Sequence, residues 1–353
     1  MGKIVKSALA VAAVVFLAVA TFGGSLAPIF AAGSTLGALS IAAQYAIMSF
    51  ATQLITAGIG KLTSKGIEAN AQNFGTKVTS RGSLQARQII YGKTRVGGTI
   101  TFLRTSGTDN NKLSMYIVFA GHEVQSFEKI FFDDTQISFS AANMSGAGTN
   151  NKVQNVTNFT NSDNDNAFTG NSLARFTLND GSQTSKDALA QQTHGSSVID
   201  NNFILKNCAY MYVEMIYDPE EMPQLPNITA EIKGKKVFDP RDTNQTFGDK
   251  TTFVWSNNPA LHVLDYLTNT TYGLKATADE VNTSLAAGGF AAAANTCEQD
   301  VTTNSITDDR YTANGFTNMS AKGTGIIEGI LSSCGGKLTF NNGKFNIFVA
   351  AAQ

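Results

Sequence analysis

The chain has 353 residues, of which 42% are hydrophobic and only 15% are charged, against about 25% charged residues in ordinary soluble domains. That length suits roughly two domains with sizeable cores. The 26 basic and 27 acidic residues leave a formal net charge of -1, which argues against a protein whose main task is to coat nucleic acid. Three scattered cysteines without CxxC spacing exclude a disulfide scaffold, and we expect Cys208, Cys297 and Cys334 to be buried, inert thiols.

An apolar leader opens the chain, since residues 7–60 contain no Asp, Glu, Lys or Arg. A first apolar run, 8–22, is shorter than the ~20 residues that cross a bilayer, and a second run, 36–59, carries a polar stripe. We expect two helices, either packed as a hairpin in an oligomer or inserted into a membrane. A cleaved export signal is the third alternative, but the cleavage site around 27–32 is poor.

The sequence pattern in the middle of the chain predicts an antiparallel sheet. Segments 88–91 and 99–103 are short β-forming runs separated by glycines, 112–120 is an apolar strand, and 130–132 ends in a hairpin corner at Asp133-Asp134. Residues 208–217 alternate in polarity, as do 228–232. That alternation predicts strands with one buried and one exposed face.

A polar stretch, 140–200, interrupts this region. It is rich in Asn, Gly, Ser and Thr, a composition that cannot bury a core of its own. We therefore expect a long surface insertion.

The last third of the chain reads as helical. Asn258-Pro259 is a helix start signal, Gly273 is the expected end of that helix, and 277–280 fits a capping box. A further helix is expected at 324–334, followed by a β-hairpin with its turn at 341–343.

These elements predict an α+β chain of five parts. They are an apolar helical leader (1–60), the first part of a β-rich domain built of antiparallel sheet or barrel (61–139), the surface insertion (140–200), the continuation of the β-rich domain (201–255), and a helical segment ending in a β-hairpin (256–353).

No catalytic or metal-binding constellation is complete. His122-Glu123 begins like a zinc-protease HExxH, but residue 126 is Ser. Asn161, Asp163 and Asp165 alternate like a calcium loop but lack its Gly and its final Glu. Glycine-rich segments miss the spacing of nucleotide-binding loops. We expect a protein that is not an enzyme, with no cofactor and no metal site.

Two stretches together carry a family resemblance. Residues 87–100 read RQIIYGKTRVGGTI, residues 226–241 read PNITAEIKGKKVFDPR, and WSNNPAL follows at 255–261. They resemble the N-terminal hub region of lambda-type phage tail tip attachment proteins, also called host specificity or central tail hub proteins. The motif residues, which the resemblance implies are structural, are Tyr91, Gly92, Arg95, Gly234, Asp239, Pro240, Arg241, Trp255, Ser256, Asn258 and Pro259.

The resemblance implies a virion protein at the tail tip, made in the host cytoplasm. It implies a homotrimer that joins the tail tube to the central fibre, closes the tube, and takes part in host attachment and DNA ejection. The implied partners are the distal tail tube, other tail-tip proteins and the tape-measure protein, with residues 1–60 a candidate contact to the host membrane. Sequence-specific nucleic-acid binding is not implied.

The chain departs from the family's pattern in two ways. Family members usually continue for many hundreds of residues, so we expect the receptor-binding part elsewhere, and the apolar leader is not a feature the family requires. The principal alternative is an exported or membrane-anchored β-rich adhesin of the bacterial envelope, which the leader and the Asn/Thr/Gly-rich body would suit. A cell-wall hydrolase on a tail tip is a third reading.

Overall fold

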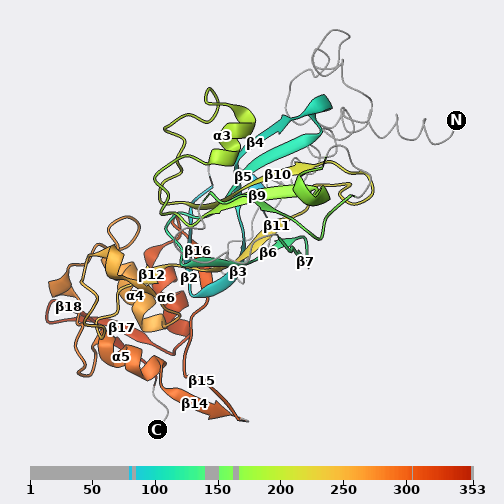
Figure 1. The fold of residues 1–353 in the computed structure, drawn as a ribbon. Helices are drawn as coiled ribbons and strands as arrows, with labels where there is room; N and C mark the ends of the chain where they lie inside the picture. The colour runs from blue at the N-terminus through green and yellow to red at the C-terminus, as the bar shows by residue number, and fades with distance from the viewer. Residues whose placement is uncertain (1–78, 82–84, 140–150, 162–166, 304, 351–353) are drawn as a thin grey trace, which may run out of the picture.

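The computed structural model describes residues 79–81, 85–139, 151–161, 167–303 and 305–350 (Figure 1). The expected leader, 1–60, and two positions of the calcium-like pattern, 163 and 165, lie outside the described residues. Within those residues, no helix is long and apolar enough to span a membrane.

Strands dominate the part of the chain before residue 256. They are β1 (Ser80–Arg81), β2 (Gln88–Tyr91), β3 (Lys93–Gly97), β4 (Thr99–Ser106), β5 (Lys112–Ala120), β6 (Ser126–Phe132), β7 (Thr135–Gln136), β8 (Gln154–Asn155), β9 (Ala174–Asn179), β10 (Ala209–Ile216), β11 (Ile228–Lys233), β12 (Lys236–Val237) and β13 (Val254–Trp255). The α-helix α3 (Ala188–His194) lies among them.

The remainder, residues 256–350, is here called the helical part. Its helices are α4 (Pro259–Thr268), α5 (Phe290–Cys297) and α6 (Gly323–Ser332), and its strands are β14 (Asp300–Thr303), β15 (Ile306–Asp309), β16 (Gly315–Asn318), β17 (Lys337–Asn341) and β18 (Lys344–Phe348). In Figure 1 its orange and red elements gather at one end of the molecule, and β14 and β15 form a projecting hairpin.

Two larger sheets hold most strands of the strand-rich part. One has the order β1-β4-β5-β10-β9-β8 and the other the order β3-β11-β6-β7. Every pairing in them is antiparallel except the one between β1 and β4. The predicted α+β class and antiparallel sheet are thus confirmed, and within the described residues neither sheet closes into a barrel.

The main core lies between the two sheets. Side chains of β5 and β10, such as Ile117 and Met211, form one buried cluster with side chains of β6 and β11, such as Ile130 and Ile232. Alternation along each strand sends every second residue into this layer. The two sheets therefore pack face to face.

Strand β10 is buried on both faces, so the expectation of one exposed face is wrong for it. Met211 and Val213 enter the core between the sheets, while Tyr210 and Tyr212 join a second cluster with Leu189 of α3. Alternate residues of β10 do point to opposite faces of the sheet, as the sequence predicted, but both faces are covered. The outer layer that covers its second face comes from a distant segment, which local polarity does not reveal.

The expected insertion, 140–200, contributes to the sheet as well as to the surface. Strand β9 pairs with β10 along its length, and Phe176 is fully buried. That part of the expectation is corrected, because β9 pairs with β10 and buries side chains such as Phe176 in the core between the two sheets rather than in a core of its own. The domain boundaries proposed from the sequence stay a prediction.

The helical part follows its local signals closely. Asn258 caps α4 by accepting a hydrogen bond from the Ala260 N–H at 3.0 Å, and Thr277 and Glu280 form the predicted capping box on a short 3₁₀ turn. Helix α4 ends at Thr268 rather than at Gly273, because the chain turns at Asn269. Helix α5 was not predicted from the sequence. Its alanine-rich run has no side-chain cap to signal where a helix begins.

Strand β2 lies between the two cores. Ile90 belongs to the cluster between the sheets, whereas Ile89 and Tyr91 belong to the cluster around α4, α5 and α6. Its antiparallel partner, β16, comes from the helical part. A single strand of four residues thus joins the two packing units.

Candidate functional site at the junction of the sheets and helices

Most of the motif residues singled out from the sequence meet at one place, here called the junction. It consists of β2 with Gly92, the segment 234–241, and the start of α4 with the turn before it. The carbonyl oxygen of Gly92 accepts hydrogen bonds from the Gly234 N–H at 2.7 Å and from Trp255 Nε1 at 3.2 Å. The two stretches of the sequence resemblance are therefore in direct contact.

Both glycines of the junction stand where a side chain does not fit. Gly92 has φ +63, and a Cβ there would lie 2.2 Å from the carbonyl oxygen of Ala313. A Cβ on Gly234 would lie 2.2 Å from the carbonyl oxygen of Ile90. Backbone runs directly against backbone here, which only glycine permits.

A buried ion pair lies beneath these glycines. Lys235 Nζ is 2.9 Å from Asp265 Oδ2, and the two side chains are 10% and 5% exposed. The hydroxyl of Tyr91 donates to the same carboxylate oxygen at 2.6 Å, and Lys235 also donates to the hydroxyl of Tyr272. Four groups from β2, the 234–235 segment, α4 and the loop after α4 thus satisfy one another.

Burial sets the titration of this cluster. Loss of water lowers the pKa of Lys235, although the Asp265 carboxylate opposes that shift. Burial, with Asp265 next in importance, raises the pKa of both Tyr91 and Tyr272. The tyrosines therefore stay neutral donors, and the charge of Asp265 is balanced by the lysine.

Two neutral histidines flank the cluster. His122 Nε2 accepts the Ile90 N–H at 2.9 Å, and its Nδ1 lies 2.7 Å from the Glu123 carbonyl oxygen. His262 stacks on Tyr91 with ring centroids 4.7 Å apart, and its Nε2 lies 2.8 Å from the carbonyl oxygen of Ser256. Both ring nitrogens of His122 thus have partners in the core.

Lowering the pH is expected to destabilise the fold through these histidines. Burial lowers the pKa of His122 and of His262 from 6.5 to about 4. The unfolded chain therefore binds these protons first, so stability is complete above about pH 6.5 and is lost as the pH falls toward 4, by roughly 3 kcal/mol for each histidine. Urea unfolding between about pH 7 and about pH 4.5 measures this slope. A His122→Gln variant with an unchanged slope would contradict the assignment.

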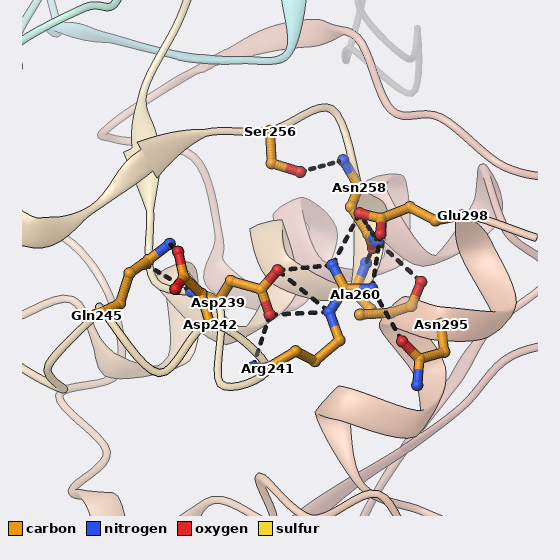
Figure 2. A network of polar contacts seen from close by, with 10 residues as sticks. Asp239, Arg241, Asp242, Gln245, Ser256, Asn258, Ala260, Asn295 and Glu298 are labelled. Carbon is orange, nitrogen blue, oxygen red and sulfur yellow. Dashed lines mark hydrogen bonds and ion pairs between the residues drawn. The ribbon is translucent and has the colours of Figure 1, made fainter.

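A second polar network, closer to the surface, joins the 239–241 turn and the start of α4 to the end of α5 (Figure 2). Arg241 contacts the Asp239 carboxylate through Nε at 2.9 Å and Nη2 at 2.6 Å, and it contacts Glu298 through Nη1 at 2.6 Å and Nη2 at 2.9 Å. Hydrogen bonding to Asp239 is the main cause that raises the pKa of Arg241. One guanidinium therefore bridges two carboxylates with paired bonds on each side.

The cap of α4 completes this network. Asn258 Nδ2 donates to the Ala294 carbonyl oxygen at 3.0 Å and to Glu298 at 2.9 Å, while its backbone N–H donates to the Ser256 hydroxyl. Figure 2 shows Asn258 and Arg241 converging on Glu298 from different segments. The start of α4, the end of α5 and the turn at 239–241 are thereby held together.

Arg95 alone among the motif residues lies away from the junction. It sits on β3, where Nε donates to Thr229 at 2.8 Å and the guanidinium lies 4.0 Å from the centre of the Phe131 ring. Pro240 and Pro259 occupy the turn after β12 and the first position of α4. That the motif residues are characteristic of the phage tail-hub family stays a prediction.

Sequence reasoning missed the partners that give the junction its chemistry. Lys235, Asp265, Tyr272 and Glu298 lie in or near the stretches of the resemblance, but nothing in their spacing indicated mutual contact. Nor do the described residues contain a group of three or more His, Cys, Asp or Glu side chains that could hold a metal ion. The arrangement holds these elements in fixed positions, and its charged side chains form ion pairs and hydrogen bonds with one another.

Neither a protein-family model nor a curated protein matches the sequence. Among solved structures, a chain of "Virion of native gene transfer agent (GTA) particle" matches with a TM-score of 0.35 and 12% sequence identity, covering 74% of this chain and 63% of that chain. The alignment thus spans less than two thirds of that neighbour's length.

Proposed function

We propose that this chain is a structural protein of a phage-like virion, and specifically the trimeric hub at the distal end of the tail tube. The observation that carries the proposal is the convergence of the two resembling stretches on one junction. The Gly234 N–H and Trp255 Nε1 both donate to the Gly92 carbonyl oxygen there, although Gly92 is far from both in the sequence. The stretches therefore form one structural unit in this fold.

The construction of the junction suits a hub. A protein that joins a tube to a fibre must transmit force between its parts without their moving independently. The Lys235–Asp265 pair is buried between those parts, and Arg241 holds Asp239 and Glu298 across them. Each of these charges finds its partner on another element, which favours one arrangement of the elements over others.

The proposal includes the partners and the place of action. The chain would contact the distal tail tube, other tail-tip proteins and the tape-measure protein, would close the tube before infection, and would act in attachment and DNA ejection. Contact of residues 1–60 with the host membrane belongs to the same proposal, as does the absence of enzymatic activity.

Cryo-electron microscopy of purified particles tests this function. Particles would be made with and without an early stop codon in this chain's reading frame, and the stop-codon mutant would be complemented by the wild-type chain. We expect the chain to co-purify with particles and a threefold density at the tail end that is lost with the stop codon and restored by complementation. Fractionation of the chain with host membranes, in cells without particles, would instead identify an envelope adhesin.

A further inference from the structure

Most of the large apolar side chains that the described residues leave exposed lie in the helical part. They are Leu274, Leu285, Val301, Ile306, Phe340 and Phe348. Val301 and Ile306 stand on the hairpin of β14 and β15, here called the arm, which projects from the molecule in Figure 1. A hairpin of two strands has little stability of its own in water, and exposed apolar side chains on it favour a partner.

One face of the arm combines apolar and acidic side chains. Val301 pairs with Asp308, and Ile306 is two residues from Asp308 on the same strand, so the three share a face. Val301 is 38% exposed and Ile306 is 64% exposed. Asp309, which pairs with Asp300, lies on the opposite face. The two strands of the arm contain no Lys or Arg, so the arm is acidic.

The hairpin of β17 and β18 offers a complementary surface, here called the outer face. Lys337 pairs with Phe348, which puts both side chains on this face. Lys344 and Phe348 are the first and last residues of β18, so Lys344 shares the face as well. Phe348 is 48% exposed, and both lysines are exposed. Neither strand contains an Asp or Glu, so the outer face is basic.

The arm and the outer face match in the order of their side chains. In the arm, the apolar Val301 stands directly opposite the acidic Asp308. On the outer face, the apolar Phe348 stands directly opposite the basic Lys337. Side chains directly opposite each other are about 5 Å apart in either hairpin, so Asp308 can meet Lys337 while Val301 covers Phe348. Within the described residues, neither Asp308 nor Lys337 forms an ion pair.

We propose that the arm of one copy of this chain binds the outer face of a second copy, with Asp308 beside Lys337. Both complementary surfaces belong to this chain, so a second copy supplies the partner surface for each. In a closed homotrimer every copy gives one arm and receives one. The inference rests on the homotrimer of the proposed function and adds the side chains that join its copies.

Charge reversal tests the contact. Sedimentation velocity compares the purified full chain with Asp308→Lys, with Lys337→Asp and with the double variant, at several protein and salt concentrations. Each single reversal is expected to raise the dissociation constant of the oligomer about tenfold, because like charges then face each other. The double variant is expected to recover most of this loss. Asp309→Lys makes the same change of charge on the opposite face of the arm, and we expect it to change the constant by no more than about twofold.

Cross-linking tests whether the contact joins separate copies. Asp308→Cys chains are mixed with Lys337→Cys chains and treated with a short thiol cross-linker, which the buried native cysteines do not reach. We expect a cross-linked dimer from this mixture and little from Asp309→Cys mixed with Lys337→Cys. Urea midpoints equal to that of the wild-type chain are expected for all variants, because the changed side chains are exposed.

Three results would overturn the inference. They are a wild-type chain that stays monomeric, equal effects of Asp308→Lys and Asp309→Lys, and a double variant that associates no better than the single ones. An arm-dependent complex with a different tail protein, with self-association unchanged, would assign the arm to that partner instead. A threefold density at the tail end beside any of these results would leave the hub role standing. Rescue by the double variant without that density would overturn the hub role alone.

Discussion

Replacing Asp265 by asparagine is expected to lower the free energy of unfolding by about 3–5 kcal/mol. The substitution keeps the shape of the side chain but leaves the Lys235 ammonium buried without a counter-charge, and it weakens the hydrogen bond from Tyr91. A lone buried charge is far more costly than a missing pair. Urea or guanidinium unfolding of purified protein measures the difference.

Two further variants separate the ion pair from general disturbance of the core. Replacing both partners, as Lys235→Met with Asp265→Leu, is expected to recover most of the loss, because no buried charge then remains. Glu123→Gln, which breaks the neighbouring exposed pair with Lys236, is expected to cost no more than about 1 kcal/mol. A double variant as unstable as Asp265→Asn would contradict the account.

The elements with strong local signals could be predicted from the sequence. Strand β5 was expected at 112–120 and has these bounds, because its apolar run ends at Gly121. The Asn342-Gly343 turn has positive φ at both residues, as the short hairpin between β17 and β18 requires. The cap of α4 by Asn258 is likewise a local hydrogen bond.

What the sequence did not reveal depends on contacts between distant residues. Tyr210 and Tyr212 are buried because α3 and its following loop cover the outer face of β10, and nothing near β10 in the chain reports that cover. The Lys235–Asp265 pair spans two elements, so neither residue looks different from a surface charge. The family resemblance linked the two stretches as one pattern, but it did not predict that they contact each other in the fold.

Replacing Gly234 by alanine is expected to destabilise the chain by more than about 4 kcal/mol, in the range that single substitutions rarely reach. The new Cβ would lie 2.2 Å from the Ile90 carbonyl oxygen and 2.6 Å from its carbonyl carbon. Neither atom is the end of a flexible side chain, so β2 itself must shift. The shift would strain the hydrogen bond between the Lys235 N–H and the Ile90 carbonyl oxygen.

Gly92→Ala is expected to lower the free energy of unfolding by a similar amount. A second glycine with positive φ, Gly170, separates the effect of the close backbone contact from that of backbone strain. Gly92 and Gly170 both have positive φ, but a Cβ on Gly170 would meet no atom within 4 Å. Gly170→Ala is therefore expected to cost only the backbone strain of about 1–2 kcal/mol. Gly329→Ala, in open space on α6, is expected to gain about 0.5–1 kcal/mol. Unfolding experiments on all four variants would refute the close approach of the backbones if Gly92→Ala and Gly234→Ala cost no more than Gly170→Ala.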